Sequence, residues 1–182
     1  MINNWRPRCR ALCTLFLVIA ALWTMVRSGR AQLYVGQYSA NTVGEYDTTT
    51  GAPINASLIT GLSAPTALTL SANDLFVANS GSGTVGEYNA ATGAAINASL
   101  ITGLIDPEGL ALSGNNLFVV NISGPIGTVG EYNATTGAAI NASLITGLNG
   151  PVGLALSGNN LFVAESSRAG RALLTADWFL AD

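Results

Sequence analysis

Histidine and lysine are missing from this 182-residue chain, and charged residues of all kinds make up only 9% of it. Without either residue, a serine, threonine or cysteine nucleophile has no neighbouring base of the usual kinds to activate it. Both cysteines, Cys9 and Cys13, lie close to the N-terminus. The sequence therefore argues against nucleophilic catalysis, and the rest of the chain can enter an oxidising compartment without forming a disulfide.

Basic residues are also scarce beyond the first 31 positions. All seven are arginines, and only Arg168 and Arg171 follow residue 31. Against ten carboxylates they leave a net charge of 2 − 10 = −8 on residues 32–182. Because phosphate binding requires a basic surface, the sequence excludes nucleic acid as a partner and disfavours an anionic membrane surface.

The N-terminal segment has the pattern of a secretory signal peptide. Three arginines precede a sixteen-residue apolar run without charge at 11–26, and Gly29 and Ala31 are small residues at the −3 and −1 positions of a cleavage site. We therefore predict a signal helix within residues 1–31 and a mature N-terminus at Gln32. The alternative is an uncleaved anchor, but a membrane span needs about 20 apolar residues. The expected protein is secreted, periplasmic or on the cell surface, with no stable membrane span after cleavage.

A repeated unit of about 42 residues fills the remaining chain. The segment GTVGEYNAATGAAINASLITGL at 83–104 returns at 127–148 with one change, and a looser copy stands at 41–62. A companion phrase reads LYVGQ, LFVAN, LFVVN and LFVAE, and starts at residues 33, 75, 117 and 161, in steps of 42, 42 and 44. Such a period, with several short strands in each unit, is typical of β-propeller blades.

Each unit predicts four antiparallel strands joined by Asn- and Gly-containing loops, with units starting near 33, 66, 109 and 153. The expected strands are 66–70, 75–79, 84–88, 97–102, 109–112, 117–121, 128–132 and 141–146. Residues 147–151 are expected to end the last of these. The first unit lacks its first strand and the fourth has only two, which makes thirteen strands. The predicted fold class is all-β, an incomplete propeller of 3 to 3.5 blades over residues 32–165 that forms an open arc.

The tail at 166–182 departs from the repeat. It reads SSRAGRALLTADWFLAD after Glu165, where the repeat would place a GTVGEYN strand. Two interpretations stay open: a truncated or frameshifted piece of a longer propeller, or a segment that caps the array, with 173–180 covering one face. Because propellers have four to eight blades, we expect the chain either to self-associate to complete a ring or to be a poorly soluble fragment.

These units resemble the NHL-type blade of bacterial exported proteins. The resemblance rests on Pro-x-Gly-Leu-Ala-Leu, a polar turn and a strand of the Leu-Phe-Val-Ala-Asn type, seen at 107–121 and 151–165 as LFVVN and LFVAE, and on a Gly-x-Val-x-x-Tyr strand at 127–132. The same strand order occurs in gluconolactonase-like and virginiamycin B lyase-like propellers. The resemblance implies that the first strand of each blade lines the centre and the fourth lies at the rim.

Family chemistry suggests one set of candidate ligands. Virginiamycin B lyase-like enzymes use a histidine beside a metal, which this chain lacks. Gluconolactonase-like enzymes hold a divalent metal with acidic and Asn side chains. The matching positions here are Gln37, Asn79, Asn121 and Glu165, and the metal candidates among them are Asn79, Asn121 and Glu165. Their oxygens would suit Ca²⁺. The alternative is that they end a buried strand at the solvent face.

Two further sets recur in every Gly-Glu-Tyr triplet. Glu45, Glu87 and Glu131 are expected to be solvated, because equivalent residues of adjacent blades spread too far apart to act as an acid–base pair. The tyrosines that follow, at 46, 88 and 132, are expected to pack between blades.

Two functions remain open for a chain with these features. The first is an exported, non-catalytic β-propeller that serves as a scaffold or as a module binding a protein or glycan. It requires no catalytic residue and no cofactor. The alternative is a metal-dependent hydrolase or lyase of the gluconolactonase-like type. The absence of His and Lys, and the few carboxylates at the expected ligand positions, favour the first.

Overall fold

The computed structural model of the chain describes residues 31–124 and 126–166, together with the backbone of 178–180. The predicted signal helix lies outside these residues. All regular structure in the described part is β, with fourteen strands in four sheets and no helix, and every pairing is antiparallel. The predicted all-β class is confirmed. The described part also contains no helix long and apolar enough to cross a membrane.

The four sheets follow one another along the chain, and each is a simple meander. The first two contain β1 (Gln32–Gln37), β2 (Thr42–Asp47) and β3 (Pro53–Ile59), then β4 (Pro65–Ser71), β5 (Asp74–Asn79), β6 (Thr84–Asn89) and β7 (Ala95–Ile101). The third contains β8 (Pro107–Ser113), β9 (Asn116–Ser123), β10 (Ile126–Asn133) and β11 (Ala139–Asn149). The fourth contains β12 (Pro151–Ser157), β13 (Asn160–Glu165) and β14 (Trp178–Leu180).

Two details differ from the expected strands. Strand β11 continues to Asn149, so the prediction that residues 147–151 break it was wrong from Gly147 to Asn149. The longer loop of the third unit lets β10 begin at Ile126, and Ile126 and Gly127 pair with Asn149 and Leu148. Strand β14 was not predicted. It pairs with β13 and adds a third strand to the fourth sheet.

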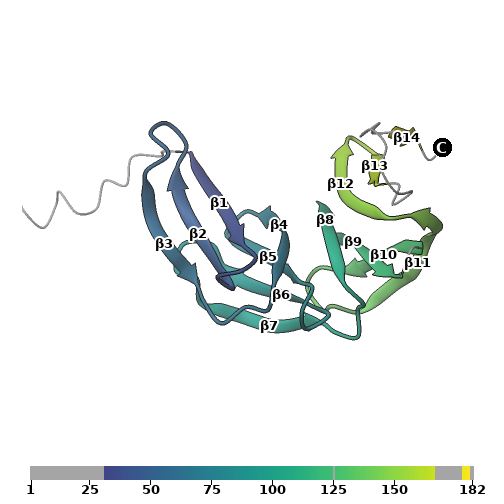
Figure 1. Cartoon of the computed structure of the whole chain (residues 1–182), viewed down its shortest axis with the longest axis horizontal. Coiled ribbons are helices and arrows are strands. Elements are labelled where there is room, and N and C mark those ends of the chain that lie inside the picture. The colour runs from purple at the N-terminus through teal and green to yellow at the C-terminus, as the bar shows by residue number, and fades with distance from the viewer. Residues whose placement is uncertain (1–30, 125, 167–177, 181–182) are drawn as a thin grey trace, which may run out of the picture.

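The sheets are arranged around a common centre as an open arc (Figure 1). On the inner side, β8 contacts both β4 and β12, which are the first strands of their sheets, and β1 contacts β4 from the first sheet. Strands β3, β7 and β11 lie on the outer side (Figure 1). The arc begins at the first sheet and ends at the fourth, with a gap between these ends, as expected for an incomplete propeller.

The core consists of apolar layers between successive sheets. We call the face that a sheet turns to the next one its forward face, and the opposite face its backward face. Because side chains alternate along a strand, neighbouring residues serve different layers. Leu75 and Val77 of β5 pack backward against the first sheet, whereas Phe76 and Ala78 pack forward against the third. A third layer joins Val120 and Val129 to Val163 of the fourth sheet.

The β6–β7 and β10–β11 hairpin loops lock the second and third sheets onto the sheet before them. The carboxamide oxygen of Asn89 accepts hydrogen bonds from the backbone of Ala91 (3.1 Å) and Thr92 (3.0 Å), which folds the loop of the β6–β7 hairpin into an Asx turn. The loop ends at Gly93 with φ 71°, and a Cβ there would overlap the carbonyl oxygen of Leu58 in the preceding sheet. Glycine is required at this position both for its backbone angle and for the close approach.

Candidate functional site

The four candidate positions occupy equivalent places on the second strand of each repeat. Gln37, Asn79 and Glu165 are the last residues of β1, β5 and β13, and Asn121 stands at the same repeat position in β9. Each pairs with a residue at or near the start of a neighbouring strand, as Asn79 does with Thr84 at the start of β6 and Pro65 at the start of β4. The repeat therefore brings one polar side chain per sheet to the connection between successive sheets.

Three of these side chains accept a hydrogen bond from the segment just before their sheet, which is the connection for Asn79 and Asn121 and the last residue of β11 for Glu165. The oxygen of Asn79 accepts from the Ser63 N–H at 3.4 Å, and that of Asn121 from the Ile105 N–H at 2.5 Å. The carboxylate of Glu165 accepts from the Asn149 N–H at 3.0 Å. In every case the donor lies sixteen residues earlier. The side chains thus bind the connecting segment to the sheet that it enters.

Backbone pairing reinforces the same junction. The N–H following the polar residue donates to the connection, from Ser80 to the Ala64 carbonyl at 3.0 Å and from Ser166 to the Gly150 carbonyl at 2.8 Å. Asn79 is 3% exposed, so its bond to the connection satisfies a side chain that has almost no access to water. These bonds give Asn79, Asn121 and Glu165 a role in holding the segments before their sheets in place.

Gln37 makes a different set of bonds because no repeat precedes it among the described residues. Its amide donates to the hydroxyl of Tyr46 at 3.1 Å and to the Ala56 carbonyl at 3.4 Å. Asn79 also hydrogen-bonds to Tyr88, the matching tyrosine of the second sheet. Gln37 and Asn79 therefore both bind the hydroxyl of a tyrosine in their own sheet.

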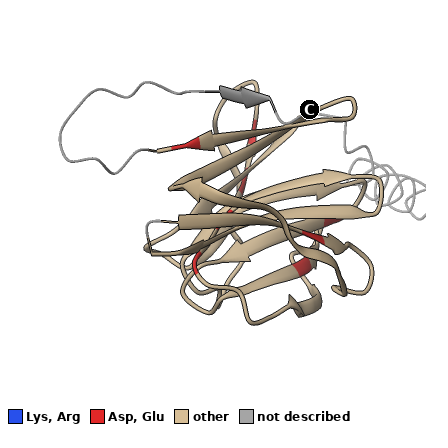
Figure 2. Cartoon of the chain, turned by 90° about the vertical axis from the view of Figure 1, so that its right-hand side faces the viewer, with Lys and Arg blue, Asp and Glu red and all other residues tan. Residues whose placement is uncertain are grey.

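The capacity of these groups to hold a metal is limited by their chemistry. Glu165 is the single carboxylate among them, and hard cations such as Ca²⁺ take six to eight oxygen ligands. Within the described part of the chain, no three His, Cys, Asp or Glu residues lie close enough to hold a metal ion together. Figure 2 shows the carboxylates distributed over several sheets, with no Lys or Arg among the described residues.

The repeated glutamates do not share one environment. Glu87 and Glu131 are partly exposed, but Glu45 is only 3% exposed, and its Oε1 has no hydrogen-bond partner among the described residues. The expectation that all three are solvated was therefore wrong for Glu45, which is covered in the layer between the first and second sheets. Partial burial raises the pKa of Glu87, and the nearby charge of Asp74 raises it further.

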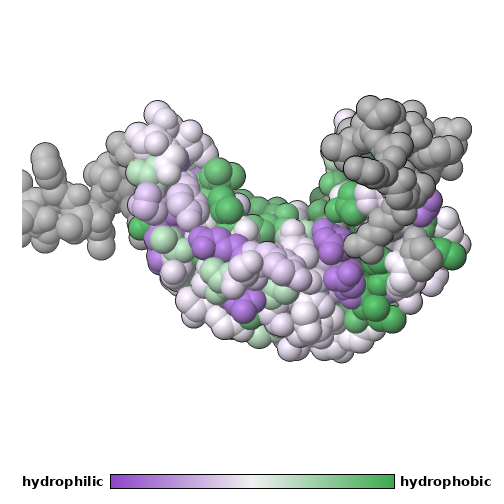
Figure 3. Space-filling model, in the orientation of Figure 1, coloured by the Kyte–Doolittle hydropathy of each residue, from purple (hydrophilic) through white to green (hydrophobic). Residues whose placement is uncertain are grey.

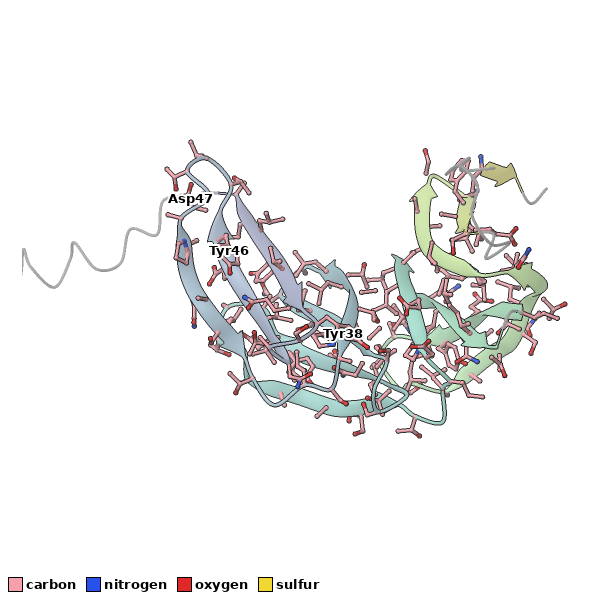
Figure 4. All side chains as sticks on the ribbon, viewed as in Figure 1. Tyr38, Tyr46 and Asp47 are labelled. Carbon is pink, nitrogen blue, oxygen red and sulfur yellow. The ribbon has the colours of Figure 1, made fainter. Side chains whose placement is uncertain are left out.

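The repeated tyrosines pack as expected where a preceding sheet exists. Tyr88 and Tyr132 are 6% and 8% exposed and belong to the apolar layers. Burial raises the pKa of both hydroxyls, and the bond with Asn79 partly offsets this for Tyr88. Tyr46 is only half-buried and lies on the first sheet at one end of the arc, next to Asp47 (Figure 4). The backward face of that sheet is not covered by any other sheet of the described residues.

Sequence reasoning missed the hydrogen bonds of the candidate residues. The signal was present, because each of Asn79, Asn121 and Glu165 stands a constant sixteen residues after the connection that it binds. Reasoning by residue type alone placed them as metal ligands or as exposed strand ends. The sheet geometry instead places them beside the connection.

The fold defines a β-propeller-like protein, and comparison with solved structures agrees. Hydrazine synthase of Kuenenia stuttgartiensis superposes with a TM-score of 0.63 at 16% identity, over 76% of this chain and 40% of that one. Virginiamycin B lyase from Staphylococcus aureus gives 0.58 at 17%, over 84% and 52%. The computationally designed Ika4 protein gives 0.53 at 18%, over 83% and 86%.

These likenesses establish the fold and no activity, since the identities are 18% or lower. The chain spans most of Ika4 but only about half of the lyase and less than half of the synthase. No protein-family model matches the chain, and no curated protein matches it.

Proposed function

We propose that the chain is an exported, non-catalytic β-propeller repeat protein of the NHL type, acting as a scaffold or as a module that binds a protein or glycan. One observation carries the proposal. At three of the four expected ligand positions, the side-chain oxygen accepts a hydrogen bond from the backbone of the segment just before its own sheet. These hydrogen bonds support a structural function for the residues that a catalytic propeller would turn to a substrate or metal.

The loops support a binding function of this kind. The β2–β3, β6–β7 and β10–β11 loops expose threonine side chains around the same Asx turn. Repeated loops without Lys or Arg suit hydrogen bonding to a glycan or to a protein surface and do not attract polyanions. The proposal also covers an arc that belongs to a longer propeller, in which the same loops would continue around the ring.

Export is tested by the mass of the protein outside the cell. We expect residues 1–31 to be removed, so the intact mass of the exported protein should correspond to residues 32–182. A product retained in the membrane with residues 1–31 still attached would contradict export as a cleaved protein.

The alternative of a metal-dependent hydrolase or lyase is separated by thermal unfolding with Ca²⁺, Mg²⁺ or Zn²⁺. An ion that binds only the folded chain at one hundred times its Kd stabilises it by about 2.7 kcal/mol. The scaffold proposal expects the same melting temperature with each ion as with a chelator. A rise with one ion that is lost in Glu165→Gln would instead support the alternative.

A further inference from the structure

The backward face of the first sheet has the residues of a sheet-to-sheet interface, but no sheet of the described residues lies against it. Leu33 is 51% exposed, whereas Leu75 and Leu117, at the same repeat position, are 1% and 0% exposed. Val35 is 38% exposed, whereas Val77 and Val119 are both fully buried. The same residue types are thus buried in the second and third sheets and open to solvent in the first.

Position in the arc, and not the repeat itself, causes this exposure. Ile54, Ile96 and Ile140 are also equivalent, and they lie on the outer strands of successive sheets. Their exposed fractions are 50%, 54% and 54%, almost independent of whether a sheet precedes theirs. Leu33 and Val35 are therefore exposed because their partner surface is missing among the described residues.

The partner surface can be identified from the layers already present. In the layer between the second and third sheets, Leu117 and Val119 lie against Phe76 and Ala78 of β5. The surface that covers the backward face of the third sheet therefore includes the forward face of β5, which contains the sequence Leu-Phe-Val-Ala.

The fourth sheet carries this same strand at the other end of the arc. Its β13 reads NLFVAE, with Leu161 and Val163 packed backward on the third sheet. Phe162 and Ala164 alternate with them and so point forward, and both remain partly exposed. One chain thus presents the two complementary halves of a single interface, one at each end.

We propose that the backward face of the first sheet binds the forward face of the fourth sheet of a second copy, and that two such contacts close a ring. When two different surfaces of the same chain bind each other, the copies form a closed ring if the rotation from one copy to the next adds up to a full turn. Two copies supply 2 × 4 = 8 sheets, within the four to eight blades of known propellers. The arc is open on one side between its ends (Figure 1), and apolar residues gather in that hollow (Figure 3).

This inference concerns assembly and goes beyond the proposed scaffold function, which would hold for a single arc as well.

The test is the native mass of the purified full chain by light scattering, compared with the mass of the same sample in denaturant. We expect the native mass to be twice the denatured mass. Leu33→Glu and Phe162→Glu each place a charge in the proposed contact and should both reduce this ratio to one. Ile96→Glu is the matched control, since Ile96 is 54% exposed on an outer strand, and it should keep the ratio at two.

Circular dichroism of each variant shows whether the sheets still form. If Leu33→Glu is unfolded, the milder Leu33→Ser replaces it, with the same expected loss of mass. A wild-type ratio of one, a ratio above two, or a folded Leu33 variant that still has twice the denatured mass would each overturn the proposal.

Discussion

At the scale of the residue, single positions in each repeat have a defined structural task that their neighbours in the sequence do not share. Gly93 and Gly137 have φ near 70°, and a Cβ on either would overlap the carbonyl oxygen of Leu58 or Leu100 in the preceding sheet. Gly51 has the same backbone angle but no atom within 4 Å of the position of a Cβ. In the second and third sheets glycine is therefore required both for its positive φ and for the close approach of the preceding sheet. In the first sheet it is required for its positive φ alone.

This difference predicts unequal effects of one substitution. Gly51→Ala should destabilise the fold by about 1 kcal/mol, the cost of a left-handed backbone angle for alanine. Gly93→Ala should cost roughly 3 kcal/mol or more, because the added methyl also forces two sheets apart. Urea unfolding of the two variants measures the difference. Equal losses would show that the loop does not press on the preceding sheet.

The bonds at the sheet connections predict a second effect. Asn121→Ala leaves the Ile105 N–H without its acceptor and should destabilise by about 1–2 kcal/mol. Asn160→Ala, at an exposed strand start, is the matched control and should change stability by less than about 0.5 kcal/mol. Thermal unfolding provides both values, and similar values for the two would contradict the structural function assigned to Asn121.

At the scale of the element, strand length follows from what each strand can pair with. Strands β7 and β11 share the sequence AINASLITGL, yet β7 ends at Ile101 and β11 at Asn149. The difference arises in the preceding hairpin, because the third unit has two more residues there and β10 starts early enough to pair with Leu148 and Asn149. An identical sequence therefore forms strands of different length.

Deleting Ser123 and Gly124 should remove this extra pairing. The hairpin would then match that of the second unit, and residues 147–149 should exchange their amide protons as rapidly as residues 103–105. Amide hydrogen exchange followed by mass spectrometry compares these two segments directly. Unchanged protection of residues 147–149 would mean that the strand is extended by its own sequence and not by its partner.

At the scale of the whole molecule, stability comes from apolar layers copied between successive sheets. Leu75 and Leu117 occupy the same place in two such layers and are almost completely buried. Leu161 takes that place in the fourth sheet and is partly exposed. The contribution of each leucine to the free energy of unfolding should therefore increase with the extent to which neighbouring sheets bury it.

Replacing these leucines by alanine measures that dependence. Leu75→Ala and Leu117→Ala should each destabilise by about 2–5 kcal/mol, through lost burial and the cavity left behind. Leu161→Ala should cost clearly less, since its side chain is already partly in water. Denaturant unfolding of all three variants at one protein concentration is the measurement, and a loss at Leu161 equal to the others would contradict a gradient along the arc.

The repeat alone was sufficient to predict the all-β class, the order of the strands and the antiparallel hairpins. A period near 42 residues with Asn and Gly at fixed loop positions dictates local pairing, and local pairing determines each sheet. Tyr88 and Tyr132 were correctly expected between sheets for the same reason, since their place in the repeat puts them on one face of a strand.

Only the tertiary structure decided which copy of a repeated residue is covered. Glu45 is buried while Glu87 and Glu131 are partly exposed, and Leu33 is open while Leu75 is buried, although each set has one sequence context. Likewise, the oxygens of Asn79, Asn121 and Glu165 meet a backbone donor sixteen residues away only once the sheets are stacked. Sequence patterns specify contacts within a sheet, whereas burial and long-range hydrogen bonds depend on the neighbour that each sheet has in space.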